Sequence, residues 1–307
     1  MNTFQKNINE TRIIRHKLNI KGKLLSFERP LVMGILNVTP DSFYADSRSQ
    51  GDKAVAGRIE TIIAEGGAIV DVGGYSTRPN AEHVTMEEEW RRLTPALKIM
   101  GKNYPAIPVS VDTYRSEIAR RAVDEYGVSI INDISGGAQD EKMFEAVAKL
   151  KVPYILTHFP DNAGTMQFHG VDNGVSEELS NRFQGEGKKT VAEAVMFYFA
   201  EKLQVLRRLG VNDVILDPGF GFGKTLEENY ELMRNLKNVK ILFDCPLMVG
   251  ISRKRMIYNL LNCTPEESLN GTTVLHTYSL LQGANILRVH DVKAAVGAIE
   301  VVEKLKC

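Results

Sequence analysis

The chain repeats one pattern eight times: a short, almost purely apolar run that stops at a polar residue or glycine, followed by a longer segment with helical periodicity. Near-continuous Val, Ile and Leu without polar alternation is typical of strands buried on both faces, as in parallel sheets. The runs are LVMGILN at 31–37, AIVDVGG at 68–74, PVSVDT at 108–113, SIINDIS at 129–135, YILTH at 154–158, DVILDPG at 213–219, LMVGISRK at 247–254 and ILRVH at 286–290. Eight such units predict an α/β protein, a (β/α)8 TIM barrel.

Helix boundaries can be placed independently of these runs. Threonine followed three residues later by glutamate, the pattern of a capping box, occurs at Thr85, Thr225 and Thr264, and Pro265 would be the first helical residue after Thr264. Glycines that would end helices close the segments 64–67, 124–127, 207–210 and 280–283. A doubly wound sheet is the rival fold, but it seldom uses eight parallel strands at this length without a dinucleotide-binding glycine fingerprint, which the sequence lacks.

Two segments lie outside the repeat. Residues 20–27, IKGKLLSF, centre on a Lys-Gly turn and predict a hairpin at the lower end of the barrel. We therefore divide the chain into an N-terminal extension with a capping hairpin, 1–30, and a catalytic barrel, 31–307. The polar segment 159–189 is expected to be a long loop, which is typical of a functional lid or of partial disorder.

Composition limits the classes of partner. Lys and Arg number 38, as do Asp and Glu, so no bulk positive field favours nucleic acid or an anionic membrane. The three cysteines form no C-x-x-C pair, which is typical of a reducing compartment. The N-terminus has no apolar signal core, and no run reaches the roughly 20 apolar residues that span a bilayer. We expect a cytoplasmic protein with no nucleic-acid or membrane partner.

The carboxyl ends of the predicted strands carry polar residues, and catalytic residues of such barrels stand there. Asp112, Asn132 and Asp217 could converge on a ring edge with adjacent N–H donors, because carboxylate oxygens accept parallel hydrogen bonds. A second group is cationic and predicts an anion in the barrel mouth; its members are Arg78, Lys254, Arg288 and His290. Phosphate sites in these barrels typically follow strands seven and eight, where SRK and RVHD fall.

The stretch LDPGFGFGKT, 216–225, is similar to a phosphate-binding loop but fails its pattern. Pro218 stands where that loop needs glycine, and the glycines recur every second residue, which also breaks G-x-G-x-x-G. Its glycines are expected to turn the backbone sharply off strand six. Thr225 has a capping partner in Glu228, and Lys224 is expected to be a solvated lysine at a helix start.

Seven motifs occur in the order known from one family: MGILNVTPDSF (33–43), DVGGYSTRP (71–79), SVDTYR (110–115), INDISGG (131–137), ILDPGFGFGKT (215–225), VGISRK (249–254) and ILRVHDV (286–292). In these the chain resembles bacterial dihydropteroate synthases from about residue 31 to its end. The resemblance implies a folate-pathway transferase that joins 4-aminobenzoate to 6-hydroxymethyl-7,8-dihydropterin diphosphate and releases diphosphate. It also implies Mg²⁺ as cofactor and a homodimer formed through the late helices, and it makes the protein a sulfonamide target.

The resemblance assigns residues to four sites, with Lys254 near both substrates. The pterin pocket carries over as Asp112, Asn132, Asp217 and Lys254. The diphosphate site carries over as Thr77, Arg78, Arg288 and His290. The aminobenzoate side carries over as Phe222, Ser252 and Lys254. Asn37 matches the position that helps hold Mg²⁺, and the catalytic residues are expected to be Asp112, Lys254 and Arg288.

The same resemblance implies that diphosphate leaves first and that the aryl amine captures a pterin-stabilised cation, with the loops 42–50 and 75–83 excluding water. This chain departs from the family pattern at Tyr44–Gln50, Tyr75, Asn80, Thr157 and Phe159, and none of these changes removes a proposed charged contact. Two alternatives remain. A pterin-binding methyltransferase domain would leave SRK and RVH without a purpose, and an idle pterin-binding scaffold would not need the intact cationic set.

Overall fold

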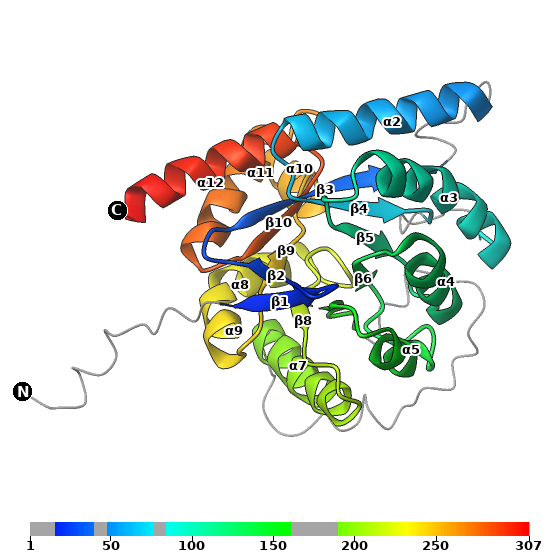
Figure 1. Cartoon of the computed structure of the whole chain (residues 1–307). Helices are drawn as coiled ribbons and strands as arrows, with labels where there is room; N and C mark the ends of the chain where they lie inside the picture. The colour runs from blue at the N-terminus through cyan, green and yellow to red at the C-terminus, as the bar shows by residue number, and fades with distance from the viewer. Residues whose placement is uncertain (1–15, 40–47, 76–83, 161–189, 307) are drawn as a thin grey trace, which may run out of the picture.

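The computed structural model describes residues 16–39, 48–75, 84–160 and 190–306, drawn in colour in Figure 1. Eight parallel strands form one sheet in the order β8-β7-β6-β5-β4-β3-β10-β9. Their bounds are β3 Leu31–Asn37, β4 Ile69–Gly73, β5 Val109–Asp112, β6 Ile130–Asp133, β7 Tyr154–Thr157, β8 Val214–Asp217, β9 Met248–Val249 and β10 Ile286–Val289. Each lies within one of the eight apolar runs, so the predicted strand count is confirmed.

The two ends of this sheet meet and close the barrel. A parallel bridge joins Leu216 of β8 to Leu247, next to β9, and the Leu216 amide donates to the Pro246 carbonyl at 2.9 Å. The β9 strand is only two residues long, because Gly250 and the residues after it turn away toward the site. The (β/α)8 barrel predicted from the sequence is therefore confirmed, and the doubly wound alternative is wrong.

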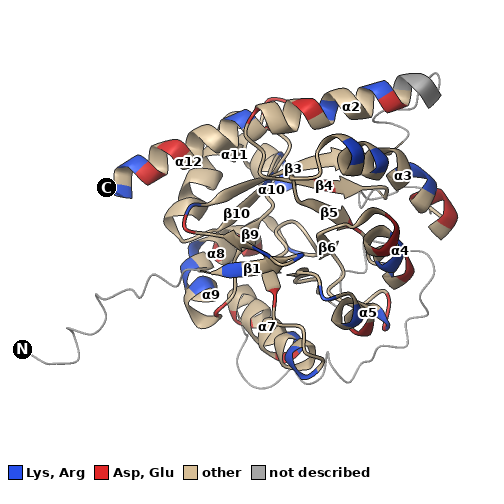
Figure 2. Ribbon diagram, in the orientation of Figure 1, with Lys and Arg blue, Asp and Glu red and all other residues tan. Residues whose placement is uncertain are grey.

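Helices ring the barrel on its outer side (Figure 1). Their bounds are α2 Arg48–Ala64, α3 Met86–Asn103, α4 Ser116–Tyr126, α5 Met143–Leu150, α7 Val191–Arg208, α8 Leu226–Arg234, α9 Leu236–Leu242, α10 Arg255–Leu261, α11 Leu269–Leu281 and α12 Val292–Lys306. Their inner faces join the strands in a continuous apolar core. Figure 2 shows Lys and Arg interspersed with Asp and Glu on the outer helices. On α4, Arg120 pairs with Glu117 and Asp124.

The N-terminal hairpin pairs β1, Lys17–Ile20, with β2, Lys23–Ser26. Its turn residues Lys21 and Gly22 both have positive φ, 51° and 82°, as a two-residue hairpin turn requires. The first strand begins at Lys17, before the predicted start, because KLNI alternates polar and apolar residues. Its buried Leu18 and Ile20 pack, together with Phe27, against residues at the amino ends of the barrel strands: Met33, Ile69, Ile130, Ile155, Ile215, Met248 and Ile286.

Threonine residues mark the starts of several helices, and not all of these starts lie where the sequence predicts them. Thr225 caps α8 with a full capping box as predicted, and a further box at Thr190 with Glu193 opens α7. Thr85 caps α3 through the Glu88 amide, but the Glu88 side chain bonds Arg91 and Arg92, so only half of that predicted box forms. The Thr264 box also forms, but α11 begins only at Leu269, so Pro265 is not its first residue. The box closes a turn over 265–268, where the Ser268 hydroxyl donates to the Pro265 carbonyl at 2.7 Å.

In the part of the chain that the structure describes, no helix combines the length and the hydropathy needed to cross a membrane. Residues 1–15, 40–47, 76–83, 161–189 and 307 lie outside the described ranges. Most of the two predicted covering loops and almost all of the predicted loop at 159–189 therefore stay predictions. So do the roles of Thr77 and Arg78.

Candidate active site

The carboxyl ends of four strands meet at one arginine. Arg288 of β10 donates from Nε to Asp71 Oδ2 of β4 and from Nη2 to Asp112 Oδ2 at the end of β5, both at 2.7 Å. Asn132 of β6 donates from Nδ2 to the same Asp71 oxygen at 3.0 Å. Strand register aligns Asp112 with Gly73 and with Asn132, and this alignment brings the side chains to one level of the barrel. Two of these residues are predicted pterin ligands, and Arg288 is a predicted diphosphate ligand.

Two acceptor atoms in this cluster are left over. Asp71 Oδ1 and Asn132 Oδ1 are buried and have no hydrogen-bond partner among the described residues. A buried acceptor without a donor typically costs about 1–3 kcal/mol, so native proteins seldom keep one without a purpose. A ligand that presents N–H groups would satisfy them. The sequence pattern includes Asp71 among the polar residues near the strand ends but assigns it no ligand.

The charges of the cluster depend on one another. Burial raises the pKa of Asp112 to about 7; Arg288 opposes that rise, while Asp71 adds to it. Burial alone would lower the pKa of the Arg288 guanidinium, but Asp71 and Asp112 together raise it above its ordinary value. Arg288 therefore stays charged, whereas Asp112 titrates near neutrality, which is unusual for a carboxyl and typical of functional sites.

Asp217, at the end of β8, lies beside this cluster. It is buried, and its Oδ1 accepts a hydrogen bond from the Gly219 amide at 2.8 Å. A Cβ placed on Gly250 would lie 3.7 Å from Asp217 Oδ2 and 3.9 Å from the Arg288 side chain, so both side chains line the space above that glycine. Burial raises the pKa of Asp217, and Lys254 opposes the rise. This carboxylate is the third predicted pterin ligand, and it shares one face of the site with Arg288.

Lys254 links the β8 and β9 loops. Its Nζ donates to the Phe220 carbonyl at 2.6 Å and lies 4.6 Å from the centre of the Phe222 ring, within cation–π range. Burial lowers the pKa of Lys254 to about 8, and Asp217 opposes the fall. Phe222 itself is buried with Ile134 and Phe159. The structure thus brings Lys254 and Phe222 together at the edge of the site, as the predicted aminobenzoate side requires.

His290 and Ser252 are neighbours at the ends of β10 and β9. The His290 amide donates to Ser252 Oγ at 3.1 Å, and Arg58 Nη2 donates to the His290 carbonyl at 2.6 Å. Burial first, and Arg288 second, lower the pKa of His290 to about 4. The lowered pKa favours a neutral imidazole at pH 7, which can donate or accept a hydrogen bond, so His290 would not add to the positive charge of the set. Its assignment to the diphosphate site stays a prediction.

The glycine loop after β8 turns as predicted, but its lysine does not lie in solvent. Gly219 has φ of 70°, and a Cβ there would come within 2.0 Å of the His158 carbonyl oxygen, so only glycine fits. Lys224 Nζ lies 2.7 Å from the Gly219 carbonyl, 3.2 Å from that of Phe222 and 3.1 Å from His158 Nδ1. The prediction of a solvated Lys224 is wrong, because the tight turn offers its ammonium several acceptors at once.

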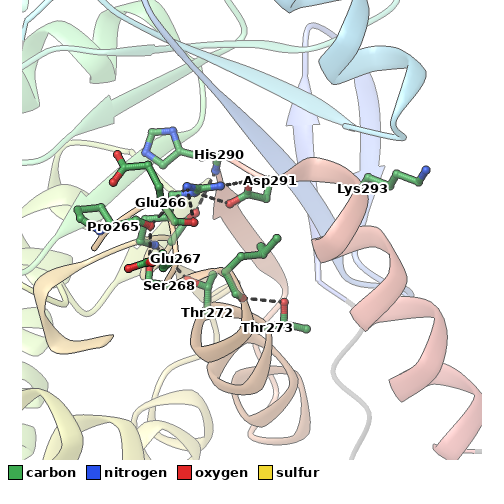
Figure 3. Close-up of polar contacts among 12 residues, drawn as sticks. Pro265, Glu266, Glu267, Ser268, Thr272, Thr273, His290, Asp291 and Lys293 are labelled. Atoms are coloured by element: carbon green, nitrogen blue, oxygen red, sulfur yellow. Dashed lines mark hydrogen bonds and ion pairs between the residues drawn. The ribbon is translucent and has the colours of Figure 1, made fainter. Parts of the chain in front are cut away.

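A second ion pair joins the SRK and RVHD motifs. Arg253 donates from Nε and Nη2 to the two carboxylate oxygens of Asp291 at 2.9 and 2.8 Å. Its Nη1 also donates to the carbonyls of Pro265 and Glu266 at 3.4 and 3.2 Å. Figure 3 shows Pro265 and Glu266 on the same side of the barrel as His290 and Asp291. The sequence pattern predicts no role for Arg253. Its positive φ of 55° places it in the turn between Ser252 and Lys254, so this ion pair fixes both neighbours.

Asn37 ends β3 and faces the cluster across Gly73. A Cβ at Gly73 would lie 3.6 Å from Asn37 Oδ1 and 3.8 Å from Asp112 Oδ2. Within the described ranges no group of three or more His, Cys, Asp or Glu side chains could hold a metal ion. Mg²⁺ often takes only one or two protein oxygens and completes its shell with water and substrate phosphates, so one amide oxygen at the mouth fits that mode.

Comparisons with known proteins agree with this geometry. The sequence profile of the family described as "Pterin binding enzyme" matches residues 33–290. Dihydropteroate synthase of Escherichia coli (strain K12) is 38% identical over 289 residues, 94% of this chain and 95% of that protein.

Solved structures give the same answer. Dihydropteroate synthase of Xanthomonas albilineans with 4-aminobenzoic acid has a TM-score of 0.82 at 33% identity, covering 95% of this chain and 99% of that one. The Yersinia pestis enzyme in a sulfonamide drug complex has a TM-score of 0.80 at 32% identity, with coverage of 95% and 99%. These matches span nearly the whole of each protein, and they include the strands that carry the cluster around Arg288. The chain belongs to the dihydropteroate synthase family of pterin-binding enzymes.

Proposed function

We propose that this protein condenses 6-hydroxymethyl-7,8-dihydropterin diphosphate with 4-aminobenzoate to give 7,8-dihydropteroate and diphosphate. One observation carries the proposal: carboxylate and amide oxygens of Asp71, Asp112, Asn132 and Asp217 surround the two cationic groups Arg288 and Lys254 at the carboxyl end of the barrel. Such a site offers acceptors to an N–H-rich ring and cations to an anionic leaving group.

The pterin ring is assigned to the acceptor side. Its aminopyrimidinone edge presents adjacent N–H donors, which suit the carboxylate of Asp217 and the unpartnered Oδ1 atom of Asn132. Asp112 accepts a hydrogen bond from Arg288 Nη2 at 2.7 Å and would face the same ring. Lys254, 4.6 Å from the Phe222 ring centre, would approach the ring from the aminobenzoate side. Asn132 Oδ1 then gains a donor, which offsets the cost of its burial.

The diphosphate is assigned to the cationic side. Arg288 would stabilise charge on the leaving group, and His290, neutral at pH 7, would contribute a hydrogen bond and no charge. Thr77 and Arg78 are expected to complete this site, but they lie outside the described residues. Mg²⁺ held by Asn37 Oδ1 would supply further positive charge to the diphosphate oxygens. A leaving group of this charge needs such support before its bond to carbon can break.

The aminobenzoate is assigned to the Phe222 side, with Ser252 and Lys254. Its aromatic ring would lie along the buried Phe222 side chain, and Lys254 would attract its carboxylate or orient its amine. Because the Ser252 hydroxyl accepts from the His290 amide, it keeps its own proton available for a ligand. Phe222 and Ser252 come from the β8 and β9 loops, so this substrate would span the seam of the barrel.

Catalysis needs no covalent intermediate on the protein. The bond between the exocyclic carbon and the diphosphate oxygen breaks, and its electron pair leaves with the diphosphate. The aryl amine nitrogen then forms the new C–N bond and loses one proton. Arg288 stabilises the negative charge on one side, and ionised Asp112 stabilises the positive charge left on the pterin. Their 2.7 Å contact supports this proposal, because it keeps the two opposite charges side by side in the site.

One assay tests the reaction. Purified protein is mixed with the pterin diphosphate, 4-aminobenzoate and Mg²⁺, and released diphosphate is measured. We expect release that depends on 4-aminobenzoate and falls when a chelator removes Mg²⁺. A methyltransferase or an idle pterin-binding scaffold would release none, so folded protein that binds pterin without releasing diphosphate would contradict the proposal. Asp217→Ala serves as the inactive control.

We further infer that the enzyme works in the cytoplasm as a homodimer. Large apolar side chains project from the late helices, among them Leu260 at 55% exposed, Val274 at 61% and Val301 at 60%. Covering such side chains is a common reason for self-association. Cys245 is a free buried thiol, which suits a reducing compartment. Light scattering coupled to gel filtration tests the dimer, and a mass of about 34 kDa, that of one chain, would contradict it.

A further inference from the structure

Lys224 and His158 form a buried polar contact that none of the roles above uses. Lys224 Nζ is surrounded by three acceptors: the carbonyls of Gly219 and Phe222, at 2.7 and 3.2 Å, and His158 Nδ1, at 3.1 Å. The Phe222 amide also donates to the Gly219 carbonyl at 3.2 Å, so the acceptors belong to one tight turn. Burial lowers the pKa of Lys224 to about 7, and Asp217 opposes the fall. The Lys224 amino group, an N–H donor whether charged or neutral, therefore links acceptors that would otherwise lie close together without a donor.

The histidine side of this contact is rigid. His158 is 6% exposed, and burial, with Lys224 as a second cause, moves its pKa well below the ordinary value. It is therefore neutral, and its Nδ1 can accept from the ammonium. Its ring meets the Tyr198 ring edge-on at 4.9 Å, and the Tyr198 hydroxyl donates to the carbonyls of Thr157 and Gly136, each at 3.3 Å. Tyr198 of helix α7 thus packs against the His158 ring and limits its movement.

A second residue, Asn229 of α8, holds the other side of the loop. Its Oδ1 accepts from the Gly221 amide at 2.7 Å, and its Nδ2 donates to the carbonyls of Lys224 and Thr225 at 3.1 and 2.6 Å. None of these contacts reaches the Gly219 or Phe222 carbonyl. Of the contacts described, the Lys224 amino group is the side-chain donor to the Phe222 carbonyl, and it also binds the Gly219 carbonyl to which the Phe222 amide donates.

The two ends of the loop differ in what they depend on. Asp217 is fixed by the β7–β8 ladder and by its own bond from the Gly219 amide. Phe222 stands five residues beyond the strand, where its ring meets Phe159 at 6.0 Å and Lys254 Nζ at 4.6 Å. Releasing the Phe222 carbonyl would move this ring, while Asp217 would keep its place. The loss would fall mainly on the aminobenzoate, because Lys224 acts on the charge of Asp217 less than Lys254 and Arg288 do.

We infer that Lys224, with His158 as its acceptor, is a positioning residue that sets the Phe222 ring for the aminobenzoate substrate. The inference rests on the proposed function, in which Phe222 borders that substrate. It assigns neither residue a contact with the reacting atoms. It also gives the FGFGK stretch a purpose other than phosphate binding: the lysine binds the loop's own carbonyls where a phosphate-binding lysine would bind the ligand.

The test compares Lys224→Met with wild type in the diphosphate-release assay. Methionine keeps the length and apolar stem of lysine but supplies no donor. We expect the KM for 4-aminobenzoate to rise about tenfold, since small displacements of a substrate-positioning group carry penalties of this order or more. The KM for the pterin diphosphate should stay within about twofold, because Asp217 does not move. Lys224→Arg, which keeps donors, should recover part of the change, and His158→Gln should show a smaller rise.

The control is Lys237→Met on α9, an exposed lysine in the second helix after the loop, which should leave both KM values unchanged. If Lys224→Met raises both KM values equally, or neither, the inference is overturned. If that variant does not fold, Lys224→Arg and His158→Gln decide the question, and unchanged aminobenzoate KM in both overturns it. Wild-type protein that releases no diphosphate would instead refute the proposed function, so the two failures are distinguishable.

Discussion

Arg288 and Asp112, which are 176 residues apart in the chain, lie 2.7 Å apart from Nη2 to Oδ2, with the guanidinium also bonded to Asp71. The three side chains are at most 17% exposed. A guanidinium held between two carboxylates is already oriented before substrate arrives, which lowers the cost of ordering it during the reaction. The same arrangement makes the protein's stability depend on its active site, because removal of the one cation leaves two acids facing each other.

The first prediction concerns that dependence. Arg288→Met should lower the free energy of unfolding by about 3 kcal/mol or more, since breaking a buried ion pair leaves uncompensated charge. Urea denaturation followed by circular dichroism measures it. The matched control is Arg29→Met, whose pair with Glu300 is 54% and 62% exposed; it should cost less than about 1 kcal/mol. Equal losses of unfolding free energy in the two variants would show that the buried Arg288 pairs stabilise the protein no more than an exposed pair does.

The second prediction separates the two ends of the pterin substrate. Asp217→Ala should weaken binding of the pterin without its diphosphate by about tenfold to a hundredfold, the usual range for a hydrogen bond to a charged group. Arg288→Met should weaken binding of the pterin diphosphate more than that of the bare pterin. Isothermal titration calorimetry with both ligands distinguishes these cases. Similar losses of bare-pterin affinity in both variants would contradict the division of roles.

The third prediction is a pH profile. Burial raises the pKa of Asp112 to about 7 and lowers that of Lys254 to about 8. Below pH 7 Asp112 gains a proton and loses acceptor capacity, and above pH 8 Lys254 loses its charge. The kcat/KM for the pterin diphosphate should therefore rise through pH 7 and fall above pH 8, since this parameter reports the free enzyme. In Asp112→Asn the low-pH limb should disappear; its persistence would assign the limb to another group.

The fourth prediction concerns the hairpin below the barrel. Leu18→Ala should lower the free energy of unfolding by about 2–4 kcal/mol, because Leu18 is 3% exposed and packs against the strand ends. The control is Leu24→Ala, whose side chain is 65% exposed and should change stability little. Both variants should keep wild-type KM values, since the hairpin lies at the end of the barrel opposite the site. A raised KM in Leu18→Ala alone would contradict this, because it would show that packing at the hairpin end of the barrel affects substrate binding at the opposite end.

Much of the fold and part of the site could be predicted from local pattern. Buried parallel strands read as apolar runs, and the residue that ends each run stands at the barrel mouth by topology alone. That is why Asp112, Asn132 and Asp217 can be grouped from the sequence alone. The Lys-Gly hairpin turn was predictable for the same kind of reason, because its two positive φ angles favour a recognisable pair of residues.

What could not be predicted depends on neighbours distant in the chain. The charge of His290 is set by burial and by Arg288, and neither is visible in the letters around it. Lys224 looks solvated beside a glycine loop until His158, 66 residues earlier, is placed next to it. Arg253 likewise lies between two predicted ligands, and its role emerges only when Asp291 is brought within 2.8 Å. The local sequence predicts the position of each residue in its strand or loop. Its charge state and its hydrogen-bond partners depend on residues that are distant in the chain.

The bridge between Leu216 and Leu247 has a consequence for local opening. With β9 only two residues long, the β8–β9 edge has the least backbone ladder of the barrel strands described, and Lys254 Nζ on the Phe220 carbonyl joins the same two segments above it. The Leu216 amide should therefore exchange its hydrogen faster than the amides in the ladder between β3 and β4. A substrate that contacts both Asp217 and Ser252 would slow this exchange. Binding in the active site would then also stabilise the closed barrel against local opening between β8 and β9.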